Sequence, residues 1–254
     1  MAALQALNAV PHRASSASVP RDVSLQALPD LRGGRTSSRH LSGAHYDEDA
    51  MLPVHREAKD WNALFYVFCH KLVLNYLWGN HEQAVEDANH VQEHLVGAQG
   101  FPYTAVFYLF DSLSRLAAYR EAPAGETDEL RRRLEANQEK LRTWAGHAPM
   151  NCLHKWHLVE AERCRTFGDR ARAIDEYDQA IEHARENGYL RDEALAHELA
   201  AMFYLDWGKE RIARTHLEDA RSAYARWGAT AKVAKLERRH GRLLGALPST
   251  RSTI

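Results

Sequence analysis

Two groups of histidines in this sequence have the spacing that metal ligands on a helix use. His90 and His94 stand four residues apart and Glu93 precedes the second, which is the inverted order of a zinc-protease helix. In such a helix the two histidines hold zinc and the glutamate acts as a base. The small residues Ala84 and Ala88 mark the inward stripe of this segment, however, and both histidines lie off that stripe. We expect a solvated helix face here and keep a zinc site as the alternative.

The second group combines thiols with imidazoles. His154 and His157 are three residues apart and can share a helical face, but Cys152 lies near the helix start and Cys164 stands two turns beyond His157. The four side chains therefore do not converge on one metal. We expect His157 to be packed and hydrogen-bonded against a neighbouring helix, and we expect no catalytic residue, metal or cofactor. A metal-dependent or thiol-based enzyme is the alternative.

The elements that must position these residues are helices. Helical periodicity runs from about residue 53 to 245, and no segment sustains the alternation of a strand. Glycines and prolines fall between the periodic segments, and short connections make sequential helices antiparallel neighbours. The pattern predicts an all-α fold of about nine helices, at 54–78, 81–97, 102–119, 126–145, 150–167, 170–187, 190–207, 210–227 and 229–244.

Three regions follow from this pattern. Residues 1–48 are rich in Ser, Arg and Gly and show almost no apolar periodicity. We expect a disordered leader there, because such a segment buries too little apolar surface to offset its chain entropy. Residues 49–246 are predicted to form a helical repeat domain, and 247–254 a flexible tail.

The composition matches an ordinary globular protein and excludes several classes. Of 254 residues, 45% are hydrophobic and 26% are charged, and 33 Lys and Arg balance 34 Asp and Glu. The hydrophobic content excludes a wholly disordered chain. The charge balance excludes a strongly basic body that would bind nucleic acid by bulk charge. No apolar run is long enough to span a membrane. Three cysteines are too few for a disulfide framework, so we expect a reducing, cytoplasmic environment.

A pattern of small residues recurs around the turn glycines Gly168 and Gly208. A small residue stands seven positions before each glycine, and others follow five and twelve positions after it. Two helices approach to about 8–10 Å only where the facing side chains are small. The pattern predicts a tetratricopeptide-like, right-handed α-solenoid of antiparallel helix hairpins. The aligned pairs are Ala161 with Ala201, Ala173 with Ala213, Ala180 with Ala220, and the bulky pair Tyr177 with Leu217.

Longer phrases in the same region resemble one family. They are LRTWAGHAPMN followed by CLHKWHLVEAE at 141–162, ENGY at 186–189, EALAHELAA and FYL within 193–205, and AYARWGATAKV at 223–233. Together they resemble the helical-repeat region of large multidomain sensor kinases, over about residues 50–240. Proteins of that family carry a serine/threonine-kinase-like domain and an AAA-type ATPase before this region, and a GAF sensor and a histidine-kinase core after it.

The resemblance implies a part of such a system that does no catalysis. The sequence holds no Gly-x-x-x-x-Gly-Lys-Ser/Thr phosphate loop, no His-Arg-Asp or Asp-Phe-Gly element and no Asp-x-Gly-x-Gly nucleotide lid. No catalytic residue can therefore be carried over. We expect a non-catalytic interaction or spacer module of a sensor histidine kinase-type, two-component signalling system, either a piece of a larger kinase or a stand-alone scaffold.

The first helices of the hairpins are expected to line a concave surface that binds a protein partner or a neighbouring signalling domain. Its mixed charge argues against a basic clamp for a C-terminal carboxylate on this surface, where Leu158 and Glu162 replace the Lys and Asn that such a clamp would need, and favours a partner with a mixed surface of its own. We expect no nucleic-acid or membrane partner, and we expect self-association if the solenoid ends expose apolar surface. In the repeat register the binding surface carries Lys155, Leu158, Glu162, Arg165, Glu198, Met202, Leu205 and Asp206.

Two further features have a structural interpretation and a functional alternative. Arginine clusters at 131–133, 163–172 and 238–242 are interleaved with acidic residues, so we expect a salt-bridged outer surface, with an RNA-binding helical repeat as the alternative. Aromatic residues at 61–78 and 101–110 should form core between stacked hairpins. No polar groups are expected to converge among them, so the sequence does not predict a ligand pocket.

Overall fold

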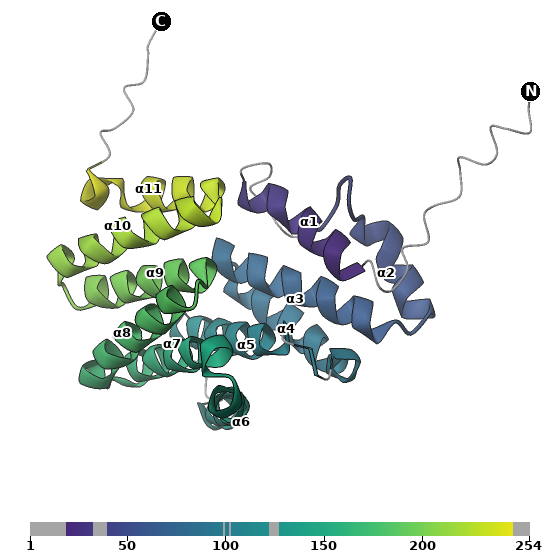
Figure 1. Cartoon of the computed structure of the whole chain (residues 1–254), viewed down its shortest axis with the longest axis horizontal. Helices are drawn as coiled ribbons and strands as arrows, with labels where there is room; N and C mark the ends of the chain where they lie inside the picture. The colour runs from purple at the N-terminus through teal and green to yellow at the C-terminus, as the bar shows by residue number, and fades with distance from the viewer. Residues whose placement is uncertain (1–18, 33–39, 99, 102, 122–126, 246–254) are drawn as a thin grey trace, which may run out of the picture.

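The computed structural model describes residues 19–32, 40–98, 100–101, 103–121 and 127–245, and in this part the chain is helical without a β-strand (Figure 1). The all-α prediction is confirmed, but the described residues hold eleven α-helices and a short 3-10 helix, rather than about nine. They are α1 (Val19–Leu31), α2 (Glu48–Glu57), α3 (Trp61–Trp78), α4 (His81–Glu93), η2 (Leu95–Ala98), α5 (Tyr103–Glu121), α6 (Thr127–His147), α7 (Pro149–Phe167), α8 (Arg170–Glu186), α9 (Leu190–Asp206), α10 (Glu210–Trp227) and α11 (Thr230–Leu244).

The helices pack as neighbouring pairs. Helix α3 pairs with α4, α5 with α6, α7 with α8 and α9 with α10, which are the four hairpins that the periodicity predicted. The first helices of the pairs also contact one another in chain order, from α3 through α5 and α7 to α9 (Figure 1). One continuous hydrophobic core therefore runs through the hairpins.

The small-residue pattern lies at the seams between paired helices, as predicted. Ala161 and Ala201 on the first helices are fully buried, and so are Ala173 and Ala213 on the second helices. The turn glycine Gly168 has a φ of 95°, a left-handed conformation that costs other residues about 1–2 kcal/mol. Small side chains at the seam and a glycine at the turn together let each hairpin close tightly.

The expected disordered leader contains a helix, so that prediction is wrong for part of its range. Helix α1 buries Val19, Val23, Ala27 and Leu31, four apolar residues at intervals of four, against α3 and α11. These four residues form one apolar stripe, which buries enough surface to dock the helix although the region as a whole is polar. Residues 1–18 and 33–39 of the leader, and the tail predicted at 247–254, lie outside the described residues.

The first predicted helix, 54–78, is two helices in the structure. Helix α2 starts earlier, at Glu48, and a bend at Lys59, with a φ of 51°, separates it from α3. Asp60 then caps α3 by accepting a hydrogen bond from the Ala63 amide at 3.0 Å. The sequence feature that indicates this break is Asp60, an aspartate that can cap a new helix within the predicted segment.

The last helix returns to the first hairpin. Lys232 Nζ on α11 donates to the Leu77 carbonyl at the end of α3, at 2.7 Å, and Lys235 Nζ donates to the same oxygen at 3.3 Å. Thr230 Oγ1 donates to the Arg32 carbonyl beside α1 at 3.1 Å. Helices α1, α3 and α11, which are far apart in the sequence, thus lie together (Figure 1).

None of the helices in the described residues is both long enough and apolar enough to cross a membrane.

Candidate functional site

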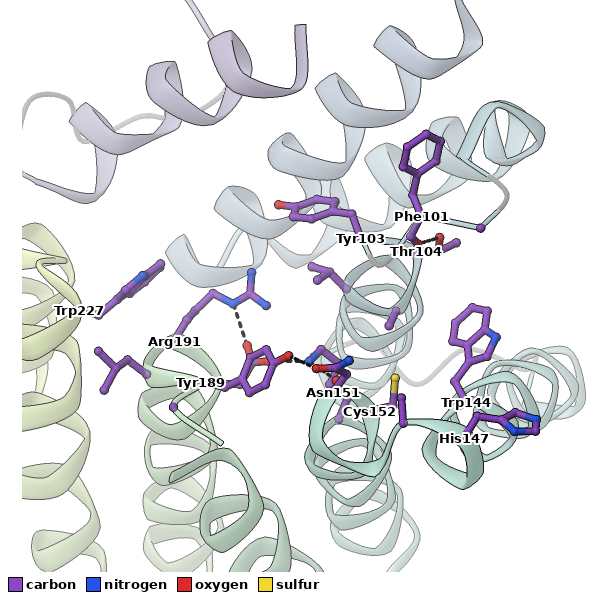
Figure 2. A pocket seen from close by; sticks show the side chains of 18 residues that line it. Phe101, Tyr103, Thr104, Trp144, His147, Asn151, Cys152, Tyr189, Arg191 and Trp227 are labelled. Atoms are coloured by element: carbon purple, nitrogen blue, oxygen red, sulfur yellow. Dashed lines mark hydrogen bonds and ion pairs between the residues drawn. The ribbon is translucent and has the colours of Figure 1, made fainter. Parts of the chain in front are cut away.

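A cleft of about 920 Å³ lies where helices α5, α7 and α9 begin and where α6 and α10 end (Figure 2). This volume is near the top of the range of ligand sites, about 300–1,000 Å³. The cleft is lined by residues 100–101, 103–106, 144, 147–148, 151–152, 155, 188–192 and 227. Polar groups therefore do meet among aromatic residues, and the expectation that none converge is wrong.

Local sequence explains why three helices start at this point. Thr104 Oγ1 donates to the Ala98 carbonyl at 3.2 Å, which fixes the chain that enters α5. Pro149 occupies the first position of α7, where a missing amide hydrogen costs nothing. Gly188, with a φ of 74°, turns the chain into α9. Helix N-termini present unpaired amides and the positive end of the helix dipole. The three N-termini here outnumber the two C-termini of α6 and α10, so the helix dipoles on balance favour negative charge in the cleft.

A charge network around Asp192 forms the floor of the cleft. His154 Nε2 and Lys155 Nζ lie 3.0 and 3.3 Å from Asp192 Oδ2. Arg191 Nε donates to Asp192 Oδ1 at 2.7 Å. Because both carboxylate oxygens have cationic or imidazole partners, the network joins α7 to α9 and leaves Asp192 little capacity to accept from a ligand.

Burial and pairing together set the charges of this network. Burial alone would raise the pKa of Asp192, but Arg191 and Lys155 hold that pKa well below its usual range. Burial lowers the pKa of His154, which keeps its ring neutral near pH 7. Two cationic side chains therefore face one carboxylate, and the floor carries an excess of positive charge.

Several hydrogen-bonding groups of the cleft are donors without a partner. Arg191 uses only Nε within the described residues, so its two terminal amino groups are unpaired. Asn151 accepts from the Tyr189 hydroxyl at 2.7 Å through Oδ1, and its Nδ2 amino group has no partner among the described residues. The amides of Arg191 and Asp192 in the first turn of α9 also have no partner in the described part of the chain. A ligand with acceptor groups can pair with these donors.

Aromatic rings flank this polar centre on two sides. Figure 2 shows Phe101 and Trp144 on one side of Asn151 and Arg191, and Trp227 on the other. Phe101 is 46% exposed although it is a large apolar residue. The Tyr189 ring lies over Lys155, with Nζ 4.2 Å from the ring centroid. The cleft therefore combines a positive, donor-rich centre with apolar walls.

The eight residues of the predicted concave surface do not form one exposed surface. Lys155, Leu158 and Glu162 are buried, and of the eight only Lys155 lines the cleft. Arg165, Glu198, Met202 and Asp206 line a second hollow of about 250 Å³ near the end of α3, and Leu205 is partly buried against the core. The repeat register placed these residues on the first helices correctly, but three of the eight are buried, Asp206 is exposed and the other four are partly exposed, so a binding role for this surface stays a prediction.

Ion pairs explain that burial. Glu162 lies 2.8 Å from Arg120 Nη1 and 3.1 Å from Arg165 Nη1, and it accepts a hydrogen bond from the Tyr177 hydroxyl. Arg165 also pairs with Asp206 at 2.6 Å. Glu198 accepts from Lys232 at 2.9 Å, and so helps to hold α11. These predicted contact residues bind one another and stabilise the stack.

The histidine groups have structural roles in the described residues, where no three potential ligands stand together as a metal site. His90 and His94 stack on Phe68 with ring centroids 4.6 and 5.9 Å away. Both stay partly exposed, so this helix face is solvated as predicted while the two rings also cover an aromatic side chain. His157 Nδ1 lies 2.7 Å from Glu176 on α8, which confirms the packed, hydrogen-bonded role predicted for it. The Cys152 thiol lines the cleft, but burial raises its pKa, which disfavours the nucleophilic thiolate.

The arginine clusters at 131–133 and 163–172 are largely paired, as predicted, whereas the described residues provide no ion pair for the arginines of the third cluster, at 238–242. Arg133 lies 2.9 Å from Asp111, and Arg163 and Arg172 lie 3.3 and 2.8 Å from Glu160. This pairing favours a salt-bridged surface over an RNA-binding stripe.

Sequence reasoning missed Arg191, Tyr189 and Trp227 as site residues. All three lie at helix ends that only the stacking of hairpins brings together. The available signal was an arginine directly after a Gly-Tyr-Leu turn. No family model, curated protein or solved structure matches the chain, so the resemblance to sensor kinases stays a prediction.

Proposed function

We propose that this chain is a non-catalytic recognition module that binds a peptide segment of a protein partner in the cleft. The observation that carries the proposal is the cleft itself, in which aromatic walls surround unpaired hydrogen-bond donors. Aromatic residues with a few oriented polar groups are the usual composition of a site that binds. The pairing of Asp192 with Lys155 and His154 supports a binding role, because it lowers the Asp192 pKa and so makes this carboxylate a weak base.

We further propose that the module serves a signalling system of the sensor histidine kinase type in the cytoplasm. The phrases at 141–162 and 223–233 support the first part. The three cysteines, which are buried free thiols, support a reducing compartment. A right-handed solenoid is the arrangement of hairpins that we propose for the stack, and self-association remains a prediction that light scattering tests.

Retention of labelled protein on a bead library of random heptapeptides tests the recognition role. Phe101→Ala and Trp144→Ala remove parts of the apolar wall, and each should weaken retention by about tenfold, as expected for an aromatic contact residue. Trp61→Ala is the matched control, because Trp61 is 40% exposed and lies outside the cleft. Retention that all three variants leave unchanged would place binding elsewhere, and a library that retains no protein would refute the proposed role.

A further inference from the structure

We propose that the cleft recognises the free C-terminal carboxylate of a peptide whose last residue is aromatic or aliphatic, with Arg191 as the anchor. The inference rests on the proposed recognition role and names the chemistry of the partner. It depends on the unpaired groups of the cleft, on its excess positive charge, and on the placement of its apolar walls.

Arg191 is the group best suited to hold a carboxylate. Its Nε bond to Asp192 fixes the guanidinium, and Figure 2 shows the terminal nitrogens of Arg191 on the side of Tyr103. The Arg191 guanidinium also lies over the Phe110 ring at 5.2 Å, which orients its plane. Two parallel N–H donors on a fixed plane match the two oxygens of a carboxylate, and such charge-assisted pairs are among the strongest hydrogen bonds in proteins.

The surroundings of Arg191 favour an anion over a neutral group. Asp192 is already bound on both oxygens, by Arg191 on one and by Lys155 and His154 on the other. Its charge is thus shared among three partners, while Lys155 and Arg191 together exceed it. The Asn151 amino group and the first-turn amides of α9, which have no partner in the described part of the chain, add further donors.

The walls and the size of the cleft favour the end of a peptide over a free small acid. A volume of about 920 Å³ exceeds what one amino-acid side chain fills. Aromatic rings lie on both sides of the polar centre, so one side can take the last side chain while the other takes the residues before it (Figure 2). A small aromatic acid would occupy only one of the two walls.

Matched peptide libraries test this chemistry. One bead library presents random heptapeptides with a free C-terminal carboxylate, and the other presents the same peptides as C-terminal amides. The full chain should be retained at least about tenfold better by the acid library, the difference expected for a charge-assisted pair. The selected acid peptides should end in aromatic or aliphatic residues. Equal retention on both libraries overturns the carboxylate anchor and leaves the recognition role intact.

Two variants distinguish the loss of carboxylate binding from the loss of folding. Arg191→Gln should abolish the preference for the acid library, but it also removes a partner of buried Asp192 and can impair folding. Asn151→Asp avoids that difficulty, because the Asn151 side chain is exposed, and its new negative charge in the same cleft should repel the peptide carboxylate. Arg163→Gln is the control, since Arg163 lies outside the cleft. A folded Asn151→Asp protein that keeps the full acid preference overturns the proposal.

A final experiment distinguishes the carboxylate of a peptide end from that of a small aromatic acid. N-acetylphenylalanine carries the same terminal group without the preceding residues. Calorimetry should show at least tenfold weaker binding of this compound than of a selected acid heptapeptide. Equal affinity would overturn the assignment to a peptide end and identify a small aromatic acid as the ligand instead.

Discussion

Glu162→Gln tests whether Glu162, a residue of the predicted binding surface, stabilises the fold through its buried ion pairs. The carboxylate is fully buried and faces Arg120 and Arg165. Burial alone would raise the Glu162 pKa, but the two arginines lower it to about 2, from an ordinary value of 4.5. At 1.36 kcal/mol per pKa unit, the ionised carboxylate contributes roughly 3 kcal/mol to stability. Its replacement leaves Arg120 without its carboxylate partner and Arg165 with Asp206 alone, so we expect a loss of about 3–5 kcal/mol, typical of breaking a buried pair.

Urea unfolding followed by circular dichroism and by tryptophan fluorescence measures this loss. Coincident transitions would justify a two-state free energy, and the thermal midpoint should fall by about 10 °C, at 2–4 °C per kcal/mol for a chain of this size. Glu139→Gln is the matched control, because Glu139 pairs with Arg142 at 2.7 Å while both side chains are more than 60% exposed. That change should cost less than about 1 kcal/mol.

The pH dependence gives a second readout of the same carboxylate. A carboxylate whose folded pKa is depressed stabilises the fold above the unfolded value of 4.5, and that stabilisation disappears as the pH falls toward about 2. The wild-type chain should therefore lose stability over this range, and Glu162→Gln should lose less. A variant that costs under 1 kcal/mol at pH 7, or that keeps the wild-type slope, would refute the assignment of Glu162 to the interior.

Three further changes test other parts of the structure. Val23→Asp places a charge in the buried face of α1, so limited proteolysis should cleave residues 19–32 while the circular dichroism of the repeat helices persists; resistance to the protease would contradict the docking of α1. Burial lowers the His197 pKa to about 3, from 6.5, so the folded state holds the neutral ring. The free energy of unfolding should therefore fall as pH decreases below about 6.5. Melting curves that coincide for wild type and His197→Gln between pH 7 and 5 would exclude this linkage. Ala201→Leu overfills the seam between α9 and α10 and should cost about 1–3 kcal/mol in urea titrations, whereas no change would show that the seam has room for larger side chains.

The hairpins could be predicted from the sequence because their signals are local. Ala161 and Ala201 recur at matched distances from Gly168 and Gly208, and the structure buries both alanines at helix seams. Helix α1 was missed because its apolar stripe is short and lies in a polar region. Its burial depends on α3 and α11, which no local pattern reveals.

The cleft was harder to predict because its parts come from three hairpins. Arg191, Asn151 and Trp144 each look unremarkable in their own helices, and only the stacking of α6, α7 and α9 brings them to one cavity. The accessibility of the predicted surface was hard to predict for a related reason. The register identifies which residues of a first helix face its neighbours, but it does not distinguish an open face from one that ion pairs such as Glu162 with Arg120 have closed.

The two lysine bonds from α11 to the Leu77 carbonyl constrain how this protein can vary. Arrays in which each unit touches only its neighbours can gain or lose units, since every junction is equivalent. Here Lys232 meets a residue 155 positions earlier in the chain. Removing or duplicating one hairpin would pull these partners apart, so the number of units is set by the geometry of closure. The same long-range contact should make the stack melt as one body and fold more slowly than an open array of equal length.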